Sequence, residues 1–164
     1  MEQQKDPDDI RSLAVTSAME YQRGLQANPF QYMTYVFFAD LLDEQSSIHE
    51  SPEVTADAVG LLETAIAISP IYLEPYIALA NRYQARGDSH LAYTMMKEKA
   101  LPWLELKYLN YERAQLRFIF KLLELAREFD DVKLTDQLQK RLAEIEAKAR
   151  VTGDIPREKR GTAQ

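Results

Sequence analysis

The sequence has 164 residues, of which 46% are apolar and 28% charged, a composition typical of a soluble globular protein with a packed core. It contains no cysteine, which excludes disulfide bonds, thiolate metal sites and a cysteine nucleophile. The formal charge of -6 gives no general attraction for phosphate groups, so we expect no nucleic-acid partner.

The N-terminal residues bear on the location of the protein. Residues 1–9 are polar and acidic, whereas a secretory signal starts with basic residues followed by an apolar run. No stretch of the sequence approaches the roughly 20 apolar residues needed to cross a bilayer. We therefore expect a cytoplasmic protein without a membrane partner, in which residues 1–9 form a flexible lead.

The first third of the chain predicts three helices. Apolar residues recur at steps of three and four over residues 10–28, and Asn28-Pro29 should end that helix. Residues 30–43 are apolar on two faces, which predicts a helix packed between other helices. Ser51-Pro52 favours the start of a third helix over residues 53–68.

The following segments continue the same pattern of short helices. A helix from Pro75 should end at Arg86-Gly87-Asp88, and the next, over residues 89–100, should end at Leu101-Pro102. Residues 103–129 have a helical pattern, either as one long helix or as two helices joined near residues 109–110.

The C-terminal part predicts one more helix, over residues 132–149, followed by a flexible tail of residues 150–164. No segment alternates apolar and polar residues for long enough to predict a strand. The predicted fold class is all-α.

Two segments of the chain repeat each other at a constant offset of 41 residues. Identical or similar residues occupy matching places in both copies. The aligned pairs are Pro29 with Pro70, Tyr35 with Tyr76, Phe38 with Leu79, Ala39 with Ala80, and Leu42 with Tyr83.

This repeat resembles the tetratricopeptide repeat (TPR), in which aromatic, Leu, Ala, Tyr, Gly and Ala residues follow at set intervals. The matching residues here are Tyr76, Leu79, Ala80, Tyr83, Gly87 and Ala92. The resemblance implies antiparallel helical hairpins stacked as a short right-handed solenoid of about six to seven helices. The sequence departs from the family pattern at two places. The first copy has a longer loop, and Pro102 comes earlier than the register of the repeat predicts.

On this basis we expect residues 10–149 to form a single domain. It comprises two repeat units, residues 30–70 and 71–102, and a looser third pair of helices, residues 103–149. The alternative is an irregular helical bundle whose short helices end at prolines.

The resemblance also implies a groove lined by the first helix of each pair. Carried over position by position, the groove residues are Met33, Val36, Asp40, Asp43, Glu44, Glu74, Ile77, Asn81, Gln84 and Ala85. A peptide with apolar and basic side chains would suit this groove, because it combines apolar residues with an acidic end. Asn81 matches the Asn of the family's carboxylate clamp, but Ile77 stands where the clamp has Lys, which argues against capture of a C-terminal carboxylate.

Catalytic and metal-binding patterns have little support. His49 and His90 lie in or beside polar turns, so we expect them to be solvated side chains rather than metal ligands. Asp40, Asp43 and Glu44 share one side of a helix, but no nucleophile or phosphate loop accompanies them. We expect no catalytic residue, metal or cofactor, so an enzyme is the least favoured reading.

A basic stripe is a second candidate surface. Arg113, Arg117 and Lys121 follow each other at steps of four, with acidic neighbours that favour solvated ion pairs over a binding patch.

The preferred function is a non-enzymatic adaptor or scaffold that binds a peptide or partner-protein segment in the groove. A secretion chaperone built from three such repeats is one alternative, and a self-associating structural subunit is another.

Overall fold

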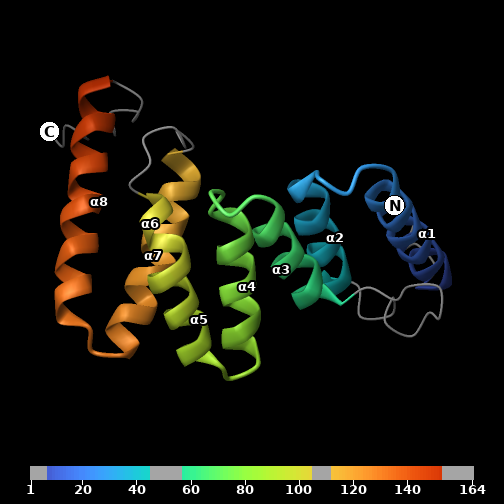
Figure 1. Ribbon diagram of the computed structural model, residues 1–164, viewed down its shortest axis with the longest axis horizontal. Coiled ribbons are helices and arrows are strands. Elements are labelled where there is room, and N and C mark those ends of the chain that lie inside the picture. The colour runs from blue at the N-terminus through green and yellow to red at the C-terminus, as the bar shows by residue number, and fades with distance from the viewer. Residues whose placement is uncertain (1–6, 45–56, 105–111, 153–164) are drawn as a thin grey trace, which may run out of the picture. The chain divides into compact units, whose positions relative to one another are not determined.

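The computed structural model describes residues 7–44, 57–104 and 112–152, and every regular element in these ranges is helical (Figure 1). The predicted all-α class is therefore confirmed for the described residues. The chain divides into two compact units, residues 1–109 and residues 110–164, and each is described by itself.

The first two helices are α1 (Pro7–Ala27) and α2 (Tyr32–Glu44). Proline suits the first position of α1 because the amide group that it lacks would have no partner within the helix. The helix ends before Asn28-Pro29, as predicted, and the hydroxyl of Tyr35 donates to the carbonyl oxygen of Pro29 at 3.0 Å. This bond fastens the short loop to α2.

Helix α3 (Ala58–Ile68) begins later than the predicted position 53. Asp57 has extended backbone angles, and its carboxylate accepts a hydrogen bond from the amide of Gly60 at 2.9 Å, which makes it the N-cap. Ser51-Pro52, the predicted start signal, lies outside the described residues. The predicted end of this helix before Ser69-Pro70 is confirmed.

Helix α4 (Glu74–Ala85) ends in the predicted break at residues 86–88. Gly87 has a φ of 86°, a conformation that glycine adopts without steric cost. The amides of Gly87 and Asp88 donate to the carbonyls of Gln84 and Tyr83 at 2.9 and 2.8 Å. These bonds satisfy carbonyl groups that the end of a helix otherwise leaves without partners.

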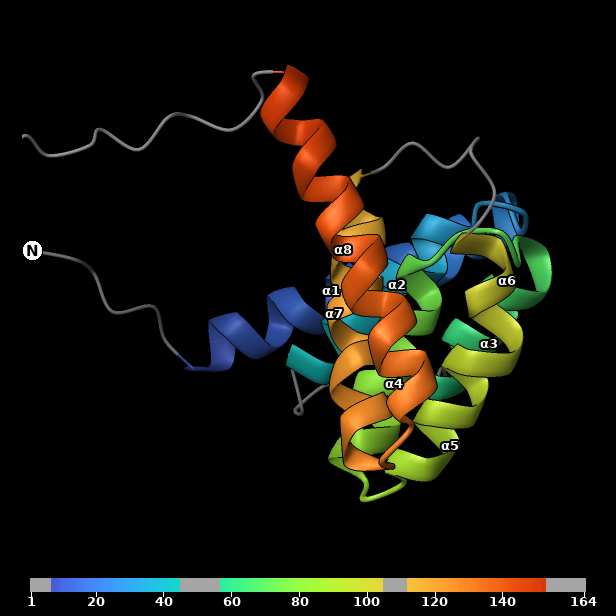
Figure 2. The same cartoon turned by 90° about the vertical axis from the view of Figure 1, so that its left-hand side faces the viewer.

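The next helical segment corrects a prediction, because Leu101-Pro102 does not end it. Helix α5 (Ser89–Met95) continues through a π-helical turn, η2 (Met96–Ala100), into α6 (Leu101–Leu104), as Figures 1 and 2 show. The amide of Leu101 donates to the carbonyl of Met96, five residues back. The wider π turn changes the hydrogen-bond pattern just before Pro102, so that the helix passes the proline.

Within residues 1–109 each helix from α1 to α5 packs against the next, and α2 also contacts α4. Both alanines and larger apolar side chains are buried among these helices. The fully buried residues include Ala18, Ala39, Ala65, Ala80, Phe38, Leu42 and Leu62.

The second unit contains α7 (Glu112–Glu128) and α8 (Val132–Thr152), which pack against each other (Figure 1). Asp130 takes the left-handed conformation at the turn, with a φ of 52°, and the carboxylate of Asp131 accepts from the amide of Leu134 at 3.0 Å. Helix α8 extends beyond the predicted end at position 149. The predicted junction at residues 109–110 lies outside the described residues.

Candidate functional site

The groove positions predicted from the repeat fall on α2 and α4, and the structure brings these two helices into contact. An ion pair joins the two helices, with Nη2 of Arg82 3.2 Å from Oδ1 of Asp40. We give the name α2–α4 face to six side chains of these two helices that are not buried: Met33, Phe37, Asp40, Glu74, Asn81 and Gln84.

Two predicted groove residues contribute little to this surface. The side chains of Val36 and Ile77 are 5% and 4% exposed, so they belong to the packed interior. Asp43 and Glu44 belong to α2, but their side chains lie outside the described part of the chain. Met33, Glu74 and Gln84 are half-buried, whereas Asn81, Ala85 and Asp40 are exposed.

Arg82 changes the electrostatics that the sequence suggested for the groove. Its side chain is 9% exposed, and it donates both to Asp40 and, at 3.1 Å, to the carbonyl of Ala78. Asp40 is therefore paired within the protein. Arg82 was not among the predicted site residues, because the two partners are 42 residues apart and no local spacing relates them.

Phe37 is a second surface residue that the sequence analysis missed. Its side chain is 51% exposed, and it lies one helical turn from both Met33 and Asp40. Spacing along α2 would have found it, since residues three and four apart share one side of a helix. An exposed phenylalanine among polar residues supplies apolar contact area to a partner.

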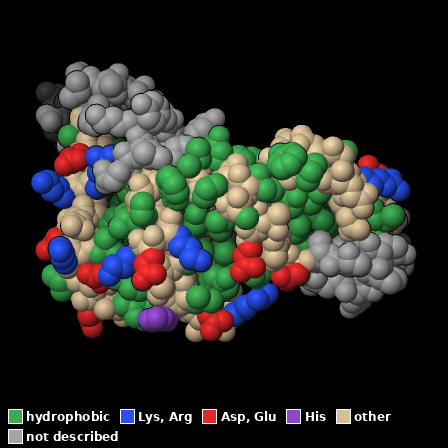
Figure 3. All heavy atoms as spheres, in the orientation of Figure 1, with side chains coloured by type: hydrophobic (Ala, Val, Ile, Leu, Met, Phe, Trp, Pro, Cys, Tyr) green, Lys and Arg blue, Asp and Glu red, His purple; other side chains and the backbone are tan. Residues whose placement is uncertain are grey.

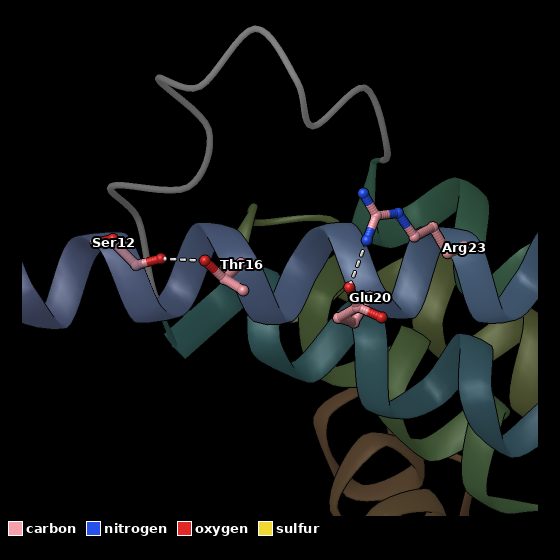
Figure 4. A network of polar contacts seen from close by, with 4 residues as sticks. All are labelled: Ser12, Thr16, Glu20 and Arg23. Carbon is pink, nitrogen blue, oxygen red and sulfur yellow. Dashed lines mark hydrogen bonds and ion pairs between the residues drawn. The ribbon is translucent and has the colours of Figure 1, made fainter.

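A groove between α1 and α2 lies beside this face. It is an open groove of about 390 Å³, lined by Thr16, Ser17, Glu20, Tyr21 and Gly24 of α1 and Thr34 of α2. Figure 4 shows two of these residues, Thr16 and Glu20, following Ser12 along α1, with Arg23 reaching back to Glu20. Their contacts are short: 2.8 Å from Thr16 Oγ1 to the carbonyl of Ser12, and 2.6 Å between Arg23 and Glu20.

On α4, Tyr83 forms a contact with a neighbouring helix. Its hydroxyl lies 3.3 Å from the carboxylate of Glu63 on α3. Burial raises the pKa of Tyr83, and the charge and the hydrogen bond of Glu63 raise this pKa further. The neutral tyrosine therefore links α3 and α4 across the physiological pH range.

The charge of the first unit is strongly acidic. Residues 1–109 contain 16 Asp and Glu against 8 Lys and Arg, a difference of -8, while residues 110–164 contain 10 against 12, a difference of +2. In the face shown in Figure 3, charged side chains of both signs lie among apolar ones. The acidic excess belongs to the first unit as a whole and favours basic partners.

In residues 7–44, 57–104 and 112–152, no three His, Asp or Glu side chains converge as a metal site. His90, predicted to lie beside a turn, is exposed in the first turn of α5, and His49 lies outside the described residues.

Compared with models of known protein families and with curated protein sequences, the chain matches none. Among the described helices, none is long and apolar enough to cross a membrane.

Proposed function

We propose that this protein is a cytoplasmic adaptor or scaffold of TPR-like architecture that binds a partner-protein segment on the α2–α4 face. The observation that carries the proposal is the contact between α2 and α4. These two helices occupy equivalent positions in the repeat of 41 residues, so their contact is the one expected when first helices of successive hairpins line a common surface.

The composition of the face supports binding of a polypeptide rather than a small metabolite. Phe37 offers exposed apolar area, while Asn81 and Glu74 offer polar groups for hydrogen bonds. Such a mixture of aromatic and polar side chains is typical of protein interfaces. Because Arg82 already pairs with Asp40, a partner contacts a nearly neutral centre in this face.

A matched pair of substitutions tests this function. Asn81→Arg places a long charged side chain in the middle of the face, and Ala67→Arg places the same side chain at an exposed position of α3. Proteins cross-linked to the full chain in a cell extract are quantified by mass spectrometry for both variants. We expect a stoichiometric partner to be retained by wild type and Ala67→Arg and to be lost from Asn81→Arg; equal retention by both variants contradicts the proposal.

Exposed apolar side chains favour self-association as a second candidate. Phe30, Val132, Leu13 and Phe120 are all more than half exposed, so each can contribute apolar area to a contact between two copies of the chain. Sedimentation equilibrium over a range of protein concentrations tests this candidate. A mass that stays at 18.9 kDa throughout would rule it out.

A further inference from the structure

The groove between α1 and α2 points to the chemistry of the partner, an inference that rests on the proposed function. We propose that this groove receives a bulky apolar side chain of a basic, amphipathic partner segment whose remainder lies along the α2–α4 face. The occupant is thus a protein segment that presents Leu, Phe or a similar residue together with Lys or Arg.

The groove exists because its lining residues are small. Thr16, Ser17, Gly24 and Thr34 leave a space that larger side chains would fill, and a Cβ atom added to Gly24 would meet nothing within 4 Å. Its volume of about 390 Å³ falls within the range of roughly 300–1,000 Å³ that is usual for ligand pockets.

The wall of the groove is held in place before any partner binds. Tyr21 lines the groove and stacks on Phe38, with ring centroids 5.7 Å apart and planes 10° from parallel. Phe38 is fully buried in the core, so Tyr21 rests on a rigid support. A preformed wall lowers the entropic cost of binding.

Exposed apolar residues extend the groove on both helices. Leu13, one turn before Ser17 on α1, is 60% exposed, and Phe37, one turn after Thr34 on α2, is 51% exposed. Phe37 also belongs to the α2–α4 face, so the groove and the face are continuous across α2. An apolar side chain bound in the groove and a chain bound on the face can therefore belong to one segment.

Charge selects a basic partner over an acidic one. Glu20 lines the groove and pairs with Arg23. The side chain of Glu20 is 64% exposed and that of Arg23 is 65% exposed. Exposed pairs of this kind contribute little to stability, so Glu20 can exchange Arg23 for a cation of the partner. The excess of 16 acidic over 8 basic residues in the first unit adds a long-range attraction for the same partner.

The test uses two synthetic peptides as probes for the full-length protein. Both carry leucines at helical spacing, and the polar positions are all lysine in one peptide and all glutamate in the other. Fluorescence anisotropy measures their binding to wild type, to Gly24→Leu, which fills the groove, and to Gln26→Leu, which adds the same side chain at an exposed position of α1 outside the lining.

We expect the lysine peptide to bind wild type and Gln26→Leu within about twofold, and Gly24→Leu at least about tenfold more weakly, since a buried apolar side chain contributes about 1.5–3 kcal/mol. The glutamate peptide should bind at least about tenfold more weakly than the lysine peptide. Equal affinity of Gly24→Leu and wild type, equal binding of the two peptides, or no binding of either would overturn the inference.

The variant Asn81→Arg separates this inference from the proposed function. If Asn81→Arg weakens binding of the lysine peptide while Gly24→Leu does not, the result supports binding on the α2–α4 face and overturns binding in the groove. If only Gly24→Leu weakens binding, the groove is confirmed as the site and the face is not part of it.

Discussion

Helix α2 presents two different surfaces to its neighbours. Toward α4 the contact is closed by an ion pair, in which the buried side chain of Arg82 pairs with Asp40. Toward α1 the space stays open, because Gly24 and Thr34 are too small to fill it. One helix therefore forms both a closed and an open contact.

The difference indicates that side-chain size at a few positions decides where a contact between two helices leaves a groove. Both contacts join neighbouring helices in the same unit. A closed contact contributes to stability, and an open one leaves apolar surface available for a partner. Substitutions that remove or add volume at these contacts should therefore change stability in opposite directions.

The largest effect is expected at Phe38, which supports the wall of the open groove. Phe38→Ala removes a fully buried ring together with its stacking on Tyr21 and should lower the free energy of unfolding by about 3–5 kcal/mol. Urea unfolding followed by far-UV circular dichroism measures this loss. Phe30→Ala, at a position that is 79% exposed, is the matched control and should change stability little; similar losses in both variants would contradict the assignment of Phe38 to the core.

An intermediate effect is expected at the closed contact. Arg82→Ala removes the ion pair with Asp40, the bond to Ala78 and the packing of a buried alkyl chain, and should cost about 1–3 kcal/mol. Asp40→Asn keeps an oxygen acceptor at a half-exposed position and should cost less than about 1 kcal/mol. A larger loss in Asp40→Asn than in Arg82→Ala, measured by the same unfolding experiment, would show that charge and not packing holds this contact.

These two residues also mark the limit of sequence analysis for this protein. The ends of α1, α3 and α4 were predicted because Pro29, Pro70 and Gly87 act on the backbone next to them. The pairing of Arg82 with Asp40 depends on how two helices 42 residues apart lie in space, which no local pattern encodes.

The start of α3 and the groove were missed for related reasons. Asp57 caps α3, and by residue type it does not stand out from the Ser51-Pro52 pair, which lies outside the described residues. The groove results from small residues on two helices, none of which is unusual in its own helix.

The smallest effect is expected at the open contact. Gly24→Ala adds a methyl group where nothing lies within 4 Å, and it removes the conformational freedom of glycine in a helix, so it should stabilise the protein by about 0.5–1 kcal/mol. Gly87→Ala is the control and should lower the stability of the protein, because a φ of 86° strains any residue other than glycine. Thermal unfolding of both variants measures the difference; a destabilised Gly24→Ala would show that the groove is not open at this position.

The π-helical turn η2 has a consequence for the length of the chain. The buried residues Ala92, Met96, Ala100 and Leu104 are spaced by four, and such a row would wind around an ordinary α-helix of 3.6 residues per turn. The wider turn at Met96–Ala100 keeps the row more nearly on one side. A deletion of one residue in this turn would let the segment close as an ordinary α-helix with Leu104 about seven residues, or about two turns, after Met96, so this segment should tolerate the loss of one residue better than the gain of one.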